Sequence, residues 1–171
     1  GAAATYLRSV LDYVLNAEKS SYYTQPWLTS QKGFSVASER IVPVDLRPYV
    51  TTGFEDETDG DKKGGWTDQG DNDMRMLTAG KQDFLGVPME IIDPESNGGK
   101  SCIVLAGGSR PYFPAKVEGI AVGRNFSRLF FLHTMAWSSK TKIGEYRIHY
   151  EDETTETVDL AGGLNIGDWR F

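Results

Sequence analysis

The residue types that could do chemistry are concentrated in one glycine-rich segment, GGWTDQGDNDMR at 64–75. Sugars are bound by an aromatic ring that covers their apolar C–H face, while amides, carboxylates or arginine grip the hydroxyls. All of these components occur here within ten residues. Because loops on a rigid scaffold often carry binding residues, we predict that this segment contacts carbohydrate. The predicted contacts are Trp66, Asp68, Gln69, Asn72 and Arg75.

Trp66 has a second interpretation that the sequence leaves open. A large ring can close one end of a β-sandwich instead of facing a ligand. The polar residues beside it would then cap turns. Spacing within a loop does not tell which way a side chain points, so a sugar platform and a structural plug are both retained for Trp66.

Carboxylates crowd the chain just before this segment, with glycines between them. They repel one another unless a cation gathers them, and calcium prefers hard oxygen ligands of this kind. We therefore predict a structural calcium ion near Asp56, Asp59 and Asp61. The loop is not an EF-hand, because the regular Asp spacing and the closing Glu are absent. A solvated acidic loop without an ion is the alternative.

Two aromatic positions outside this segment could add contact surface. Tyr112 and Phe113 lie between prolines and are predicted to form a loop tip, which is either a second contact surface or a lid over the core. Trp137 follows a long apolar run. His133 lies within that run, but no Ser, Cys or second His stands at a spacing that suggests a catalytic triad or a zinc site. We expect His133 to be a hydrogen-bonded structural residue and the chain to have no catalytic role.

The elements that must position these residues are predicted to be strands. Short apolar runs with period two, bounded by turn-forming residues, begin at residue 41. We expect strands at 41–46, 86–92, 102–105, 117–122, 127–133, 144–150 and 155–160, with a hairpin turn at 151–154. The run at 127–133 is apolar on both faces, as in a central strand. Short strands without crossover helices favour an antiparallel sandwich or barrel.

The first forty residues do not follow this pattern. Apolar residues recur at helical spacing from 4 to 18, which predicts an amphipathic helix. Residues 19–40 resemble a linker, with Trp27 as its anchor. We therefore divide the chain into 1–40, the tail of a preceding domain, and 41–171, a β-sandwich module.

Composition excludes several classes of partner. With a formal net charge of −6, the chain has no basic stripe for a phosphate backbone or an anionic membrane, so neither nucleic acid nor a membrane is expected. No apolar run is long enough to span a bilayer. The single Cys102 excludes an intrachain disulfide and is expected to be buried on a strand.

Six segments follow one another in a fairly specific order: VDL at 44–46, GGWTDQG at 64–70, FLGVPMEII at 84–92, LFFLH at 129–133, GEY at 144–146 and NIGDW at 165–169. Together they resemble a galactose-binding-like jelly-roll module of the kind appended to bacterial glycoside hydrolases. The opening AATYLRSVLDY at 3–13 is similar to the last helix of an amidotransferase-like domain that often precedes such modules. Similar modules continue into further strands after the last motif, and if such strands are missing after Phe171 an unpaired sheet edge is exposed.

The resemblance implies an all-β fold, an antiparallel β-sandwich of the jelly-roll type with a short N-terminal helix. It implies a non-catalytic carbohydrate-binding module of a polysaccharide-degrading enzyme, binding plant or microbial glycans, commonly with a structural calcium. The implied partners are polysaccharide or oligosaccharide and the domains of the parent enzyme. The implied location is secreted, periplasmic or at the bacterial cell surface. The alternative is a structural domain that packs against a parent glycoside hydrolase without binding sugar.

Overall fold

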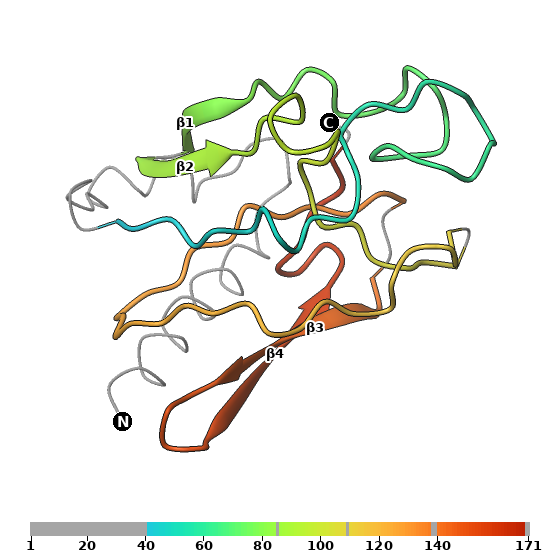
Figure 1. The fold of residues 1–171 in the computed structure, drawn as a ribbon. Coiled ribbons are helices and arrows are strands. Elements are labelled where there is room, and N and C mark those ends of the chain that lie inside the picture. The colour runs from blue at the N-terminus through green and yellow to red at the C-terminus, as the bar shows by residue number, and fades with distance from the viewer. Residues whose placement is uncertain (1–40, 85, 109, 138–139, 170–171) are drawn as a thin grey trace. The chain divides into compact units, whose positions relative to one another are not determined.

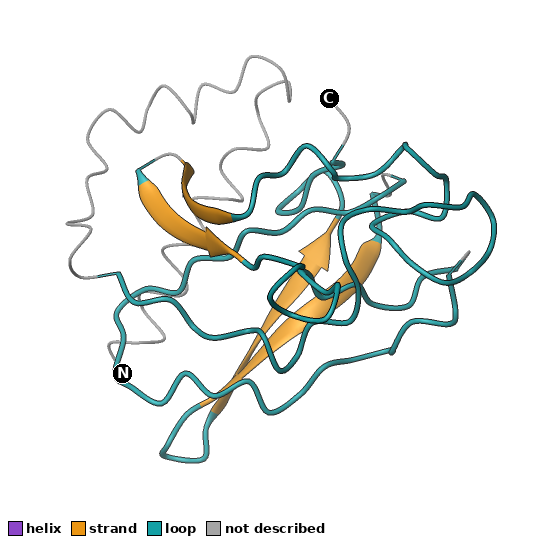
Figure 2. Ribbon diagram, turned by 45° about the horizontal axis from the view of Figure 1, so that its top comes forward, coloured by secondary structure: helices purple, strands orange, loops and turns teal. Residues whose placement is uncertain are grey.

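The structure is a computed structural model of the 171-residue chain, and it describes residues 41–84, 86–108, 110–137 and 140–169 (Figure 1). The described residues fall into two compact units, one ending at residue 123 and the other beginning at residue 124. Each unit contains one antiparallel hairpin, and loops make up most of the remaining described chain (Figure 2). The predicted helix at 4–18 and linker at 19–40 lie outside the described residues, so the division at residue 40 stays a prediction.

The hairpin of the first unit consists of β1 (Gly80–Phe84) and β2 (Val87–Ile91), paired along their whole length. Gly86 makes the tight turn with a φ of 81°, which glycine adopts at little cost. Its N–H donates to the carboxylate of Asp83 at 2.8 Å. Both ends of β2 are buried, so this strand contributes to the core of the unit.

A second pairing in this unit fixes the chain where the carboxylate-rich segment begins. The N–H of Thr52 donates to the carbonyl of Cys102 at 3.2 Å, and the N–H of Cys102 donates to the carbonyl of Thr52 at 3.0 Å. Burial raises the pKa of the Cys102 thiol to about 12, as expected for a structural cysteine. The segment from 53 to 75 is called the acidic loop below. It therefore begins directly after a residue whose backbone is held by hydrogen bonds to Cys102, and this pairing is the base of the loop.

The hairpin of the second unit consists of β3 (Lys142–His149) and β4 (Thr155–Ala161). The strands pair antiparallel, with an irregularity near the start of β3. The turn at 151–154 is closed by the N–H of Tyr150, which donates to the carbonyl of Thr154 at 2.9 Å. The hairpin and its turn confirm the prediction from the sequence.

From Tyr146 to His149 the side chains of β3 alternate as the period-two pattern predicts, whereas Glu145 is half-buried like its neighbour Tyr146. Tyr146 and Ile148 are half-buried, whereas Arg147 and His149 are exposed. Tyr146 stands opposite Val158, the buried residue of β4. One face of the hairpin therefore faces the interior of its unit.

The end of the described chain pairs with an earlier segment of the same unit. The N–H of Met135 donates to the carbonyl of Gly167, and the N–H of Trp169 donates to the carbonyl of Met135, each at 2.9 Å. Met135, Val158 and Ile166 are the buried apolar residues of this unit among those described. The core is small, and paired backbone segments surround it.

The described residues contain antiparallel strands and no helix, which confirms the all-β class at this level. The strands predicted at 86–92, 144–150 and 155–160 are present as β2, β3 and β4. None of the described residues belongs to a helix long and apolar enough to cross a membrane.

Other predicted strands are wrong. Residues 41–46, 117–122 and 127–133 are described, and none of them joins a strand ladder. Of the predicted strand at 102–105, only Cys102 pairs, in an isolated bridge with Thr52. In the segment 127–133, Phe131 and Leu132 are 39% and 47% exposed. An apolar run is buried in a central strand only if partners pair on both sides, and these side chains remain partly at the surface.

Candidate functional site

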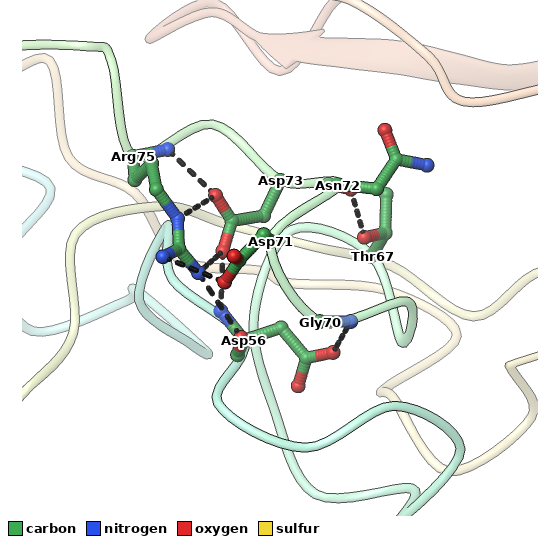
Figure 3. A network of polar contacts seen from close by, with 7 residues as sticks. All are labelled: Asp56, Thr67, Gly70, Asp71, Asn72, Asp73 and Arg75. Atoms are coloured by element: carbon green, nitrogen blue, oxygen red, sulfur yellow. Dashed lines mark hydrogen bonds and ion pairs between the residues drawn. The ribbon is translucent and has the colours of Figure 1, made fainter.

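The acidic loop is organised around a charged pair, Asp73 and Arg75 (Figure 3). The guanidinium grips the carboxylate with two parallel hydrogen bonds, from Nε to Oδ1 at 2.9 Å and from Nη2 to Oδ2 at 2.8 Å. The side chain of Asp73 is fully buried, while that of Arg75 is 35% exposed. A bidentate pair of this kind is stronger than a single-contact surface pair and also fixes the orientation of both groups.

Backbone groups complete the environment of Asp73. The N–H of Asp56 donates to its Oδ2 at 2.7 Å, and the N–H of Arg75 donates to its Oδ1 at 2.9 Å. Burial alone would raise the pKa of Asp73, but the hydrogen bonds from Arg75 and from these backbone groups outweigh it and hold the pKa below its usual value. The same contact raises the pKa of Arg75. The charged carboxylate therefore ties the two ends of the loop together.

Arg75 has most of its donors occupied inside the loop. Besides Asp73, Nη2 donates to the carbonyl of Asp56 at 3.2 Å, and Nη1 lies 2.9 Å from the carboxylate of Asp71. Arg75 therefore orders the loop, and its predicted sugar contact stays a prediction.

Three carboxylates from separate parts of the loop come together. Asp56, Asp61 and Asp68 each place one oxygen within 4.8 Å of the other two. Asp56 and Asp61 are two of the predicted calcium ligands. Asp59, the third predicted ligand, is exposed and is not a member of this group. Asp68, predicted as a sugar contact, takes its place.

The spacing of these three oxygens fits a hard cation. Oxygens that share a calcium ion lie about 2.4 Å from it and so within about 5 Å of each other. One oxygen of Asp56 accepts the N–H of Gly70 at 2.6 Å, and one of Asp68 accepts the N–H of Lys62 at 3.1 Å. The ammonium of Lys63 lies 3.5 Å from Asp61 and competes with any cation there. Calcium binding stays a prediction.

Trp66 turns its polar edge inward. Its ring nitrogen, Nε1, is buried and has no hydrogen-bond partner among the described residues. The Trp66 backbone N–H donates to the carbonyl of Phe54 at 3.2 Å, which joins the middle of the loop to its start. The orientation of the indole favours the plug interpretation for this edge of the ring.

Gln69 and Asn72 form an amide pair at the surface of the loop. Nδ2 of Asn72 donates to Oε1 of Gln69 at 2.6 Å. The Asn72 carbonyl accepts a hydrogen bond from the hydroxyl of the buried Thr67. Figure 3 shows the Asn72 amide pointing away from the pair formed by Asp73 and Arg75. The hydrogen bond from the Thr67 hydroxyl therefore fixes the backbone of Asn72, which holds the amide pair in place.

The structure adds a residue that the sequence predictions missed, Arg110. It is only 5% exposed, and its guanidinium donates to the backbone carbonyls of Gly64 and Gly65 at 2.9 Å each and to that of Trp66. A buried cation is costly unless its donors are satisfied, and three carbonyls from one turn satisfy most of them here. Arg110 therefore clamps the middle of the acidic loop.

Arg110 also holds the predicted aromatic tip, formed by Tyr112 and Phe113. Its Nε donates to the hydroxyl of Tyr112 at 3.0 Å, and its guanidinium carbon lies 4.4 Å from the ring centre of Phe113. The two rings lie 5.0 Å apart, and Tyr112 is 37% exposed. One guanidinium thus connects the acidic loop to an exposed aromatic ring. A cation next to two aromatic residues was the sequence signal for this contact.

Trp137 belongs to the second unit and is considered by itself. It is 52% exposed. Its φ of 61° lies in the left-handed region, which bulky residues rarely adopt. An exposed ring on an unusual backbone conformation fits its predicted role as a secondary contact, which stays a prediction.

His133 is a hydrogen-bonded residue of the second unit. Its Nδ1 lies 3.0 Å from the hydroxyl of Tyr146, and the ring of Phe131 stacks on Tyr146 with centres 4.1 Å apart. Burial lowers the pKa of His133, opposed by a hydrogen bond to the backbone of Asn165, and burial raises the pKa of Tyr146 to about 12. A neutral imidazole whose Nδ1 accepts a hydrogen bond from the Tyr146 hydroxyl satisfies both groups.

Comparisons with known proteins add no relative. No protein family, no curated protein and no solved structure was found to match this chain. The function is therefore argued from the geometry of the site.

Proposed function

We propose that this chain is a non-catalytic carbohydrate-binding module of a polysaccharide-degrading enzyme. The ligand is a plant or microbial glycan, and the binding surface consists of the acidic loop and the aromatic tip. The proposed complete fold is the jelly-roll sandwich that the sequence resembles. The proposed location is secreted, periplasmic or at the bacterial cell surface, within a larger protein.

The observation that carries the proposal is the double contact of Arg110. The residue joins the carbonyls of Gly64 and Trp66 to the hydroxyl of Tyr112, so an exposed ring is held at a fixed place beside a polar loop. A rigid ring with polar groups nearby is the arrangement that sugars require, because one face of a pyranose is apolar and its rim carries hydroxyls. Preorganisation also reduces the entropy lost on binding.

The amide pair supplies matching polar groups. With Nδ2 of Asn72 donating to Oε1 of Gln69, the Nε2 of Gln69 is left as a donor and the Oδ1 of Asn72 as an acceptor. Gln69 is exposed and Asn72 is half-buried, so both can be reached from solvent. A sugar hydroxyl both donates and accepts, which suits this pair. We assign the hydroxyl contacts to Gln69 and Asn72, ahead of Arg75.

Calcium is proposed as a structural ion of the same loop, held by Asp56, Asp61 and Asp68. It would neutralise carboxylates that otherwise repel one another and so stiffen the loop. A ligand that binds only the native state raises the melting temperature as its concentration rises. We expect calcium to raise the melting temperature and EDTA to reverse the change. If neither added calcium nor EDTA changes the melting temperature, the proposal of a structural calcium ion is wrong.

A glycan array tests the main proposal. The wild-type protein is applied to immobilised plant and microbial polysaccharides with calcium and, separately, with EDTA. Retention on at least one class of glycan is expected. If no glycan retains the protein in either condition, carbohydrate binding is wrong.

The second candidate is a structural domain that packs against a parent glycoside hydrolase. It is favoured by one observation, the inward-facing indole nitrogen of Trp66, because that residue then stabilises the loop instead of serving a ligand. A domain with this role would bind the isolated parent enzyme and would show no retention on the array. Retention on the glycan array therefore supports the carbohydrate-binding module, whereas binding to the parent enzyme without retention supports the structural domain.

A further inference from the structure

A tight turn next to the base of the acidic loop contains the pair Asn97 and Gly98. The N–H of Asn97 and that of Gly99 both donate to the carbonyl of Pro94, at 3.1 and 2.8 Å. The side-chain Nδ2 of Asn97 donates to the carbonyl of Lys100 at 3.0 Å. Gly98 is exposed, has a φ of 63°, and no other group lies within 4 Å of the place where a Cβ would stand.

We propose that Asn97 and Gly98 are a site of spontaneous deamidation. The backbone nitrogen of Gly98 attacks Cγ of Asn97, so a bond from nitrogen to Cγ forms, the bond from Cγ to Nδ2 breaks, and ammonia leaves with the proton of the attacking amide. Water then opens the five-membered imide at either carbonyl and gives aspartate or isoaspartate at position 97. The reaction consumes only water.

Two features of the turn favour this reaction. Gly98 has no side chain to obstruct ring closure, and the space around its Cα is open. Among the described residues, the N–H of Gly98 has no hydrogen-bond partner, so no bond has to break before the nitrogen attacks. Nδ2, the leaving group, makes one hydrogen bond to the carbonyl of Lys100, and this bond is lost when ammonia leaves.

The other described asparagines are followed by residues with side chains. Asn72 precedes Asp73, Asn125 precedes Phe126 and Asn165 precedes Ile166. Asn125 is exposed, so it is a control within the same molecule for an accessible asparagine with a bulky successor. Deamidation should therefore be selective for Asn97.

The product would disturb the base of the acidic loop. A carboxylate oxygen in place of Nδ2 would face the carbonyl of Lys100 without a donor between them, which is repulsive. Isoaspartate would also lengthen the main chain of the turn. The carbonyl of Gly99 stands only 2.6 Å from where a Cβ on Gly53 would lie, so a shift of the turn reaches the first residue of the loop. Deamidation therefore loosens the loop through Gly53, without a change at any proposed ligand contact.

Peptide mapping by mass spectrometry tests whether Asn97 deamidates faster than the control asparagine. Wild-type protein is incubated in mildly alkaline buffer, and the peptides containing Asn97 and Asn125 are followed over time. The Asn97 peptide should gain roughly one dalton as an amide becomes a carboxyl group, several-fold faster than the Asn125 peptide, and part of it should elute as isoaspartate. Equal rates for the two peptides, or no gain at Asn97, would overturn the assignment.

The melting temperature tests whether deamidation at Asn97 destabilises the acidic loop. The deamidated fraction, separated by ion exchange through its added negative charge, should melt lower than fresh protein by roughly 2–4 °C. Asn97→Asp reproduces the aspartate product without incubation and should melt lower as well, and Asn125→Asp is its matched control. Melting temperatures equal to that of fresh protein for both the deamidated fraction and Asn97→Asp would show that the turn does not support the loop.

Discussion

Asp56 and Gly65 are packed so closely that only glycine fits at position 65. A Cβ on Gly65 would lie 2.4 Å from the Cβ of Asp56 and 2.8 Å from its Cα. Gly65 also has a φ of 64°, in the left-handed region. Arg110 grips the carbonyl of Gly65 from another segment. The glycines of the acidic loop therefore allow a close approach of two backbones that brings the Asp56 carboxylate near the Trp66 turn.

Gly65→Ala should destabilise the protein strongly. The new Cβ collides with backbone atoms of Asp56, and the left-handed conformation adds its own penalty, so the free energy of unfolding should fall by about 2 kcal/mol or more. Urea unfolding measures the change. Gly64→Ala is the matched control, because no atom lies within 4 Å of its Cβ position and its φ is not in the left-handed region. Similar losses for both variants would contradict the packing argument.

Asp73→Asn should weaken the loop more than Asp71→Asn does. The Asp73 carboxylate is buried and accepts hydrogen bonds from Arg75 and from the backbone of Asp56, so losing its charge should lower the free energy of unfolding by about 2 kcal/mol. The side chain of Asp71 is 92% exposed and contacts the same arginine, so its loss should matter little. Chemical denaturation of the two variants gives the comparison. Equal stability would mean that the Asp73 charge does not order the loop.

Arg110→Lys should destabilise the protein even though it keeps the positive charge. A lysine cannot reach the carbonyls of Gly64 and Trp66 and the Tyr112 hydroxyl together, so buried acceptors lose their donors, at a total of about 2–4 kcal/mol. Arg47→Lys is the control. The side chain of Arg47 is 49% exposed, and its pairs with carboxylates are of the surface kind. An Arg110→Lys protein as stable as wild type would contradict the clamp.

The protein should lose stability in mild acid through His133. Burial lowers the pKa of His133 in the folded state, so the unfolded chain binds the proton more readily. Stability from this group is complete above the unfolded pKa of about 6.5 and falls as the pH drops through it towards the lower folded value. Urea midpoints across this range measure the effect. His133→Gln should flatten the dependence, with His149→Gln as the control for removing an exposed histidine; an unchanged profile in His133→Gln would assign the dependence to other groups.

The hairpins show how much of the fold local sequence could predict. β3 and β4 alternate apolar and polar residues around an acidic turn, so period and turn chemistry point to the same structure. β1 was missed because Lys81, Gln82 and Asp83 give it no apolar alternation. The run at 127–133 was assigned to a strand on hydrophobicity alone, but a strand also needs partners, which local sequence does not reveal.

The candidate site was located from composition but not resolved in detail. Composition drew attention to the acidic loop, and Asp56 and Asp73 are buried in it. Asp59 was predicted for the carboxylate group and Asp68 is found there instead, because the path of the loop decides which carboxylates meet. The role of Arg110 depends on contacts with residues 44 to 46 positions away in the sequence. Pairings over such distances are set by tertiary packing, which residue spacing does not encode.

The central claim is that the acidic loop and the aromatic tip bind carbohydrate. Affinity electrophoresis through gels containing a polysaccharide that the wild type binds tests it most directly. Tyr112→Ala is compared with Met76→Ala, which removes a side chain of a residue that is 89% exposed and belongs to neither the acidic loop nor the aromatic tip. We predict that Tyr112→Ala loses most of its retardation although it still folds, with a melting temperature somewhat below that of the wild type because Arg110 loses an acceptor, and that Met76→Ala is retarded like the wild type. Equal retardation of folded Tyr112→Ala and wild type would contradict the claim.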